Sequence, residues 1–265
     1  MHRRILIIDD HDDLATALSE VFSAQEHEVI IVERRAELAA LGKLEDFDLV
    51  ITDLDVSDEE SVGSNNGPLA AIPQPGPDEH LKAFTLSASN YRRDSFDEEE
   101  LKAFVATVLD YKIRFVDKAD FVKGIRENIQ FELPSALSLM HIVLEYLMKR
   151  VEKLGVCKPE QSNLFVALDE AFVNAIKHGN KYDPEKLIRI SADVSPAEAR
   201  FTIEDEGQGF DVNSIPDPLD PQNLFKTSGR GVLFIYNIMD EVAYNERGNR
   251  LTMVKKAPAE NCEPT

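Results

Sequence analysis

The stretch "LFVALDEAFVNAIKHGN", residues 164–180, predicts a helix with two different faces. Its apolar residues recur at the spacing of a helix that packs on a sheet: Leu164, Leu168, Ala171, Phe172 and Ala175. Glu170, Asn174 and His178 follow at i, i+4 and i+8, so they share the second face. On its own such a polar face is more often a solvated surface, and a site requires partners from elsewhere in the chain.

Two glycine-containing segments supply such partners. "FTIEDEGQGFD", residues 201–211, reads as a strand that ends in Asp205 and is followed by Gly207 and Gly209. Glycines after a strand let the backbone approach a ligand, and the aspartate can accept a hydrogen bond from an amino group such as that of adenine. In "TSGRGVLFI", residues 227–235, Gly229 and Gly231 precede a helix, whose free N–H groups suit phosphate.

Composition and charge limit the classes of function. With 265 residues, 43% hydrophobic and 29% charged, the chain is expected to form two soluble globular domains. A net charge of −20 is the wrong sign for binding nucleic acid or anionic membranes. We find no signal peptide and no membrane-spanning run, and Cys157 and Cys262 form no metal motif, so we expect a cytoplasmic protein.

The first half of the chain alternates short β-rich runs with helix patterns. Strands are expected at "RRILIID", "HEVIIVE", "FDLVITDLD", "LKAFTLSAS" and "KIRFVDK", and "ADFVKGIREN" is expected to be the last helix. This alternation predicts a doubly wound, parallel, five-stranded α/β domain over residues 1–125. Residues 126–257 read as an α+β two-layer domain, and residues 258–265 as a flexible tail.

Acidic residues end the first and third expected strands. Asp9, Asp10 and Asp53 would converge, because ligand sites form beyond the carboxyl ends of the strands in such sheets. Clustered carboxylates repel one another unless a cation joins them, which implies Mg²⁺. Asp53 could then attack phosphorus and form an acyl phosphate, with Ser87 and Lys118 contacting the new phosphate.

The boxes "LDEAFVNAIKHGN", "EDEGQGF" and "SGRGVLFIYNIMDEV" resemble those of the Bergerat-fold ATP-binding domain, and within it the anti-sigma-factor serine/threonine kinases. The resemblance covers residues 128–256 and implies binding of ATP with Mg²⁺. It implies that Asn174 binds Mg²⁺, that Glu170 is the general base and that Asp205 holds adenine. The remaining implied ATP contacts are Gly207, Gly209, Gly229, Arg230, Gly231 and Thr252. His178 is interpreted as a structural helix cap.

The ordered set Asp9, Asp10, Asp53, Ser87 and Lys118 resembles the receiver domain of two-component response regulators. Thr85 is the alternative to Ser87 as the switch hydroxyl. Three features depart from the receiver pattern: a long acidic segment follows Asp53, Ala119 stands where a proline is customary, and the segment from Ser87 to Lys118 is longer than typical. The resemblance implies phosphorylation of Asp53 by an upstream histidine kinase.

Together the two resemblances imply a response regulator whose output is a protein serine/threonine kinase. Its implied substrate is an anti-sigma-factor antagonist, with a sigma factor as a second partner and a homodimer as an open possibility. The alternatives are a nucleotide-dependent binding switch that transfers little phosphate, and an atypical histidine kinase that uses His141. Little flexible sequence separates the halves around residues 119–130, which predicts rigid coupling of the two domains.

Overall fold

The computed structural model describes residues 2–10, 13–33, 44–56, 80–91, 97–117, 125–158, 162–212 and 230–258. The chain divides into two compact units, unit 1 (Met1–Pro134) and unit 2 (Ser135–Thr265). The sequence "RAELAALGKL" also predicts a helix over residues 35–44; this segment and the predicted tail, residues 258–265, fall largely outside the described residues. No described helix is both long and apolar enough to cross a membrane.

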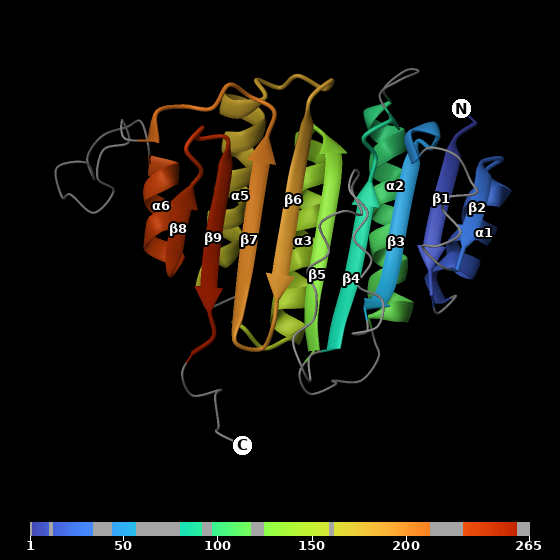
Figure 1. Cartoon of the computed structure of the whole chain (residues 1–265), viewed down its shortest axis with the longest axis horizontal. Coiled ribbons are helices and arrows are strands. Elements are labelled where there is room, and N and C mark those ends of the chain that lie inside the picture. The colour runs from blue at the N-terminus through green and yellow to red at the C-terminus, as the bar shows by residue number, and fades with distance from the viewer. Residues whose placement is uncertain are drawn as a thin grey trace. The chain divides into compact units, whose positions relative to one another are not determined.

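Unit 1 contains five strands in the order β2-β1-β3-β4-β5 (Figure 1). Their bounds are β1 Arg4–Asp9, β2 Glu28–Val32, β3 Leu49–Val56, β4 His80–Ser87 and β5 Ile125–Pro134. The described helical segments are α1 (Asp13–Ala24), the short 3₁₀ helix η2 (Leu44–Asp46), α2 (Glu98–Tyr111) and the π-helix η4 (Lys112–Val116).

The sheet of unit 1 differs from the predicted all-parallel sheet at β4. β1 pairs in parallel with β2 and β3, as expected, and β4 pairs in parallel with β5. β3 and β4, however, are antiparallel, with Val50 opposite Ser87 and Asp53 opposite Phe84. Apolar periodicity shows that a segment is a strand but not in which direction it runs, so the prediction of a parallel sheet was wrong here.

The last two predicted elements of unit 1 were also wrong. "KIRFVDK" was expected to be a strand, yet Lys112–Val116 continues α2 as a π-helix. Short apolar runs are ambiguous between helix and strand, and here the buried side chain of Lys112 gains a partner by staying helical. Ile125–Asn128, expected in a helix, begins β5. Glu127 is therefore a buried strand residue and not part of a linker.

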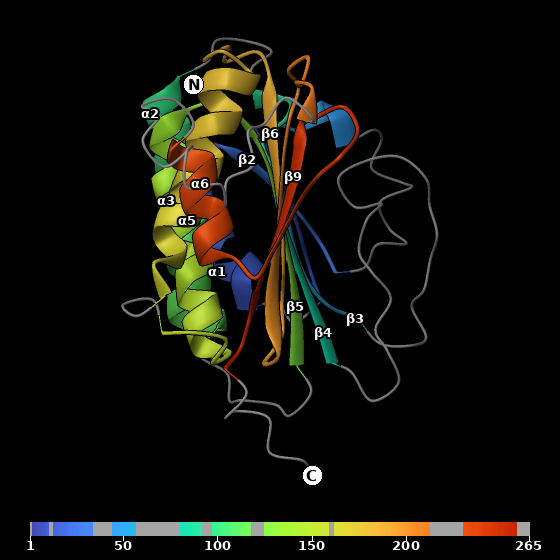
Figure 2. The same cartoon turned by 90° about the vertical axis from the view of Figure 1, so that its left-hand side faces the viewer.

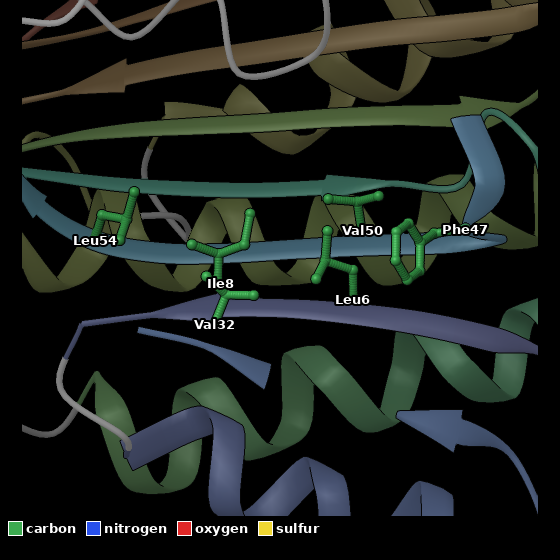
Figure 3. Packing of buried hydrophobic residues seen from close by; sticks show 6 residues of the cluster. All are labelled: Leu6, Ile8, Val32, Phe47, Val50 and Leu54. Carbon is green, nitrogen blue, oxygen red and sulfur yellow. The ribbon is translucent and has the colours of Figure 1, made fainter. Parts of the chain in front are cut away.

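The core of unit 1 includes alternate residues of adjacent strands. Leu6 and Ile8 of β1 lie on the same face as Val50 and Leu54 of β3, because side chains two apart point the same way. Figure 3 shows them packed together with Val32 and Phe47. All six are at most 9% exposed, which fixes the register of β1 against β3 and sets Asp9 beside Asp53.

Unit 2 is a two-layer α+β domain, which confirms the prediction for the second half. Its strands have the order β6-β7-β9-β8, all paired antiparallel: β6 Leu187–Val194, β7 Glu198–Asp205, β8 Glu241–Tyr244 and β9 Arg250–Lys256. Its helices are α3 (Leu137–Lys153), α5 (Leu164–Asn174) with the π-helix η5 (Ala175–Gly179), and α6 (Arg230–Ile238). They lie on one face of the sheet (Figure 2). The sequence "GVLFIYNIMDEV" predicts one helix over residues 231–242, but α6 ends at Ile238 and β8 begins at Glu241.

Candidate functional site

The helix α5 positions the polar residues from which the site is built. Its apolar stripe is buried as predicted, and each of its five members is at most 7% exposed. Glu170 and Asn174 are partly buried on the other face, one turn apart. Burial of the apolar stripe therefore fixes the direction in which the carboxylate and the amide face.

A cavity of about 290 Å³ opens next to Asn174. Asp205 and Gly209, also predicted from the sequence, line the same cavity. Its other lining residues are Ala171, Ala175, His178, Gly179, Ile203, Phe210, Val232, Tyr244, Gly248, Asn249 and Leu251. Mostly apolar walls with a few convergent polar groups are typical of a small-molecule site. Two of the three predicted segments therefore contribute predicted residues to one cavity, and the third, α6, contributes Val232.

Asp205 is the one acidic residue among the described residues that line this cavity, and it is enclosed. It is 8% exposed, and its Oδ1 accepts a 2.8 Å hydrogen bond from the N–H of Gly207. Burial raises the pKa of the Asp205 carboxyl, and the hydrogen bond from Gly207 opposes that rise. A Cβ on Gly179 would lie 2.3 Å from Cγ of Asp205, so the carboxylate fits only because residue 179 has no side chain.

The ending His-Gly-Asn of the quoted stretch ties three elements together. Asn180 is fully buried, and its Nδ2 donates to the carbonyl of Leu187 at the start of β6. Its Oδ1 accepts a 2.8 Å hydrogen bond from the N–H of Glu206, directly after β7. The end of the helix is thus fixed against the turn that carries Asp205.

The hairpin β8–β9 holds the same turn from the other side, which the sequence did not predict. Asn249 donates from Nδ2 to the carbonyl of Asp205 at 2.7 Å. Arg247 donates to the carbonyl of Gly207 at 2.7 Å and accepts from the N–H of Phe210 at 3.1 Å. Contacts of this kind follow from tertiary pairing and leave no spacing pattern in the sequence.

Glu170 lies against the first turn of α6. A Cβ on Gly231 would lie 1.7 Å from Oε1 of Glu170, so the carboxylate occupies the space that a side chain would need. Arg230 begins α6, but the placement of its side chain is not described, and Gly229 lies outside the described residues. Of the predicted phosphate-side segment, Gly231 is therefore the member that the structure places beside the polar face of α5.

Thr252 does not reach the cavity, contrary to the prediction. Its hydroxyl lies 3.3 Å from that of Thr202 on the neighbouring strand. Its sequence neighbour Leu251 lines the cavity, and Thr202 likewise alternates with the cavity residue Ile203. Adjacent residues of a strand point to opposite faces, so Thr252 faces away from the helices.

His178, which the sequence pattern indicated to be a structural helix cap, lies beside the cavity. It lies in the π-helix η5 and lines the cavity while remaining exposed. An exposed imidazole at the cavity rim is free to contact a ligand. His178 therefore belongs among the residues of the candidate site, together with Asn174.

The predicted acidic pair of unit 1 is found at the end of β1 and within β3, which continues for three residues beyond Asp53. Asp9 and Asp53 are register partners and are 3% and 8% exposed. The lysine beside them is Lys112, which sequence reasoning missed: its Nζ lies 2.8 Å and 2.9 Å from the two carboxylate oxygens of Asp53. The predicted lysine, Lys118, lies outside the described residues.

Ser87 and Thr85 do not stand beside Asp53 as predicted. Because β4 is antiparallel to β3, its last residue, Ser87, pairs with Val50, three residues before Asp53. That offset corresponds to roughly 10 Å along the strand. The hydroxyl of Ser87 lies 3.4 Å from Glu132. Thr85 pairs with Thr52, the residue before Asp53, so the side chains of Thr85 and Asp53 point to opposite faces of the sheet.

The three predicted magnesium ligands of unit 1 do not fit a metal site. Asp9 accepts two 2.8 Å hydrogen bonds from the N–H groups of Leu14 and Ala15, and so caps α1. Asp10 accepts from the N–H of Asp55 at 2.9 Å. Among the described residues no three acidic, histidine or cysteine side chains form a group that could hold a metal ion.

Comparison with known proteins places unit 2 in a family. Residues 133–255 match the model of the histidine kinase-like ATPase domain. A serine-protein kinase RsbW of Staphylococcus epidermidis is 25% identical over 142 residues, which cover 51% of this chain and 89% of the relative. Anti-sigma F factors of Geobacillus stearothermophilus and Geobacillus sp. (strain WCH70) are 32% and 33% identical and are covered over 78% and 73% of their lengths. Through residues 133–255, the chain belongs to the family of histidine kinase-like ATPase domains that includes these anti-sigma factors.

Proposed function

We propose that unit 2 binds ATP with Mg²⁺ and phosphorylates a serine or threonine of an anti-sigma-factor antagonist. The observation that carries the proposal is the cavity that Asn174 and Asp205 both line, with Glu170 of α5 packed nearby against Gly231 of α6. Relatives that are named serine-protein kinase and anti-sigma F factor support the choice of substrate class.

The residues of the cavity fit an adenine nucleotide. Asp205 is a buried acceptor for the exocyclic amino group of adenine, and Ile203 and Leu251 supply apolar walls for the base. Gly209 lines the cavity with a φ of +74°, which is costly for other residues, and its missing Cβ leaves room for the carbonyl of Arg247. The start of α6 offers N–H groups for phosphate.

Asn174 and Glu170 divide the remaining roles. The amide oxygen of Asn174 is a ligand of the type that Mg²⁺ accepts when it keeps waters and phosphate oxygens, and the ion would neutralise charge on the phosphates. Glu170, one turn earlier, takes the proton from the attacking hydroxyl of the substrate, whose oxygen then bonds to the γ-phosphorus as ADP leaves. Binding and chemistry thus rest on different residues of one helix.

A binding switch with little phosphoryl transfer is the second candidate, and one observation favours it. Glu170 packs against Gly231 and is not among the residues that line the cavity. If it keeps this position when nucleotide is bound, no base reaches the substrate hydroxyl. The atypical histidine kinase requires phosphate on His141, which is exposed on α3 and paired with Glu145 at 3.6 Å.

Labelled ATP and candidate antagonist proteins decide between these functions. Label on a serine or threonine of the antagonist supports the kinase, binding without transfer supports the switch, and label on His141 supports the histidine kinase.

Glu170→Gln should lower transfer of the phosphoryl group about 100-fold or more while ATP still binds. Asp205→Asn should instead weaken ATP binding, which a calorimetric titration measures. Unchanged ATP binding in both Asn174→Ala and Asp205→Asn would refute the nucleotide site.

Unit 1 is proposed as the regulatory input of this kinase, in the cytoplasm where ATP is available. Control by phosphorylation of Asp53 from an upstream histidine kinase, as the receiver resemblance implies, requires that Lys112 first release the carboxylate. A sigma factor and a second copy of the chain remain proposed partners. Kinase assays of wild type and of Asp53→Asn, which removes the charge that holds Lys112, test whether unit 1 controls the kinase, and equal activity in both would argue against it.

A further inference from the structure

Asp53 and Lys112 form a closed ion pair inside unit 1. Lys112 is 4% exposed, and its ammonium lies within 2.9 Å of both carboxylate oxygens of Asp53. Burial raises the pKa of Asp53 to about 6, although the ammonium opposes that rise. Burial also lowers the pKa of Lys112, but the charges of Asp53 and Asp117 outweigh it, and the net shift is upward. The contacts of Nζ with the carboxylate oxygens of Asp53 and Asp117 are those of a protonated ammonium group.

Further contacts enclose the ammonium group. Asp117 approaches Nζ of Lys112 at 3.2 Å, and the ring centroid of Phe84 lies 4.8 Å from it. The side chains of Lys112 and Asp117 are 5% and 7% exposed, so water has little access to the pair. Charge, hydrogen bonds and an aromatic face are thus all provided for a monovalent ammonium ion.

A divalent ion would need the same oxygens. Mg²⁺ requires near-octahedral oxygen ligands at about 2.1 Å, whereas an ammonium accepts longer contacts of about 2.8 Å. Both oxygens of Asp53 contact Lys112, and one oxygen each of Asp9 and Asp10 accepts backbone N–H groups. Mg²⁺ could not bind Asp53 without displacing the lysine.

We propose that the ammonium of Lys112 takes the place of a divalent cation at Asp53, so that unit 1 needs no metal ion. While this ion pair is intact, it also blocks the reaction of Asp53 with phosphoryl donors. Lys112 follows α2 directly and is the first residue of η4, and its carbonyl accepts the N–H of Asp117. Release of Asp53 therefore requires the side chain of Lys112 to leave its buried position at the end of α2. Opening of this contact is the step at which a signal would act on unit 1.

The first test compares metal dependence in the full chain without nucleotide. Thermal unfolding is followed with and without millimolar Mg²⁺ for wild type and Asp53→Asn, and we expect Mg²⁺ to change both midpoints equally. Acetyl phosphate with Mg²⁺ should leave no acyl phosphate on wild-type Asp53 by intact mass. A rise in Tm or an adduct that Asp53→Asn abolishes would overturn the proposal.

The second test measures the pair itself. Lys112→Met leaves a buried charge without a partner and should lower Tm by about 10 °C. Adding Asp53→Leu should restore at least half of the loss in Tm, and if the single variant does not fold, folding of the double variant gives the same result.

The control is Arg4→Met, which breaks the exposed Arg4–Glu28 pair and should lower Tm by about 2 °C or less. A Lys112→Met loss no larger than the control would contradict the proposal. None of these measurements uses ATP, so they stand apart from the kinase assay.

Discussion

At the scale of single residues, glycine decides how the carboxylate of Asp205 is held. Gly179 and Gly207 both leave space that Asp205 fills, since a Cβ on either would lie less than 3 Å from its carboxylate atoms. The side chain is thus confined between two backbone segments. This confinement, more than the charge itself, fixes the direction of the acceptor that we assign to adenine.

Replacing Gly179 with alanine should weaken ATP binding more than it weakens the fold. The added Cβ pushes the carboxylate of Asp205 aside, and we expect the Kd for ATP to rise about tenfold or more, or ~1.4 kcal/mol. Isothermal titration of the folded variant measures the change. Gly155→Ala is the control, because Gly155 has φ +74° but no neighbour within 4 Å. It should cost stability and leave ATP binding unchanged, and equal affinity in both variants would contradict the assignment.

Individual site residues were predictable where they belong to a local pattern. Asn174 and Asp205 were found because helical spacing and a strand that ends in Asp-x-Gly-x-Gly are visible along the chain. Lys112 was missed because its partner, Asp53, is 59 residues away and the segment reads as a strand. The predicted contact of Thr252 with the nucleotide is not supported, because the face to which a strand residue points depends on the register of the sheet, which the sequence alone does not set.

At the scale of elements, the end of α6 is joined to β9 through Asp240. Its Oδ2 accepts the N–H of Lys256 at 2.7 Å and lies 3.2 Å from Nζ of Lys255. The same Nζ donates to the carbonyl of Ile238, the last residue of α6. The carboxylate of Asp240 therefore helps to hold the end of α6 against β9.

The stability of unit 2 should depend on the ionisation of Asp240. Burial opposes ionisation, but the hydrogen bonds from Lys256 and Lys255 outweigh it and lower the pKa of Asp240 below 3.8. The stabilisation is therefore present above pH 3.8 and is lost as pH falls through the lower, folded-state pKa. Asp240→Asn should cost about 0.5 kcal/mol at pH 7, a small value because the side chain is 39% exposed. Urea unfolding at pH 7 and near pH 3 should show this difference shrinking, and a constant difference would contradict the assignment.

The elements themselves were predicted well in unit 2 and less well in unit 1. Long periodic segments such as α3 and α5 lie where their apolar stripes indicated, since each stripe has a single face to bury. The first two residues of β8, Glu241 and Val242, were assigned to the preceding helix because the four-residue strand "EVAY" is too short to show a period. The direction of β4 depends on its partner strands, about which its own residues carry no information.

At the scale of the whole molecule, acidic charge acts against compactness. The chain has 49 acidic and 29 basic side chains, which gives a net charge of −20. Like charges repel one another across a folded surface more strongly than in an extended chain. We infer that part of the folding free energy is offset by this repulsion at low ionic strength.

Salt should therefore stabilise the protein. Raising NaCl from about 0.01 M to 0.15 M shortens the Debye length from about 30 Å to 8 Å and should raise Tm by roughly 2–4 °C. Scanning calorimetry in a non-binding buffer measures the shift. Choline chloride at equal ionic strength is the control and should give the same rise. A fall in Tm would show that favourable ion pairs outweigh the repulsion.

The contact between the β8–β9 hairpin and the segment after β7 has a consequence for dynamics. Phe210 follows a strand and belongs to no regular element, yet its amide donates to the carbonyl of Arg247 at 3.1 Å. Arg247 in turn donates to Gly207, so the irregular segment is bonded at both ends to one residue. The amide proton of Phe210 should consequently exchange with deuterium as slowly as an amide proton of a β-sheet. Because Phe210 lines the cavity, its amide resonance should also report whether the cavity is occupied.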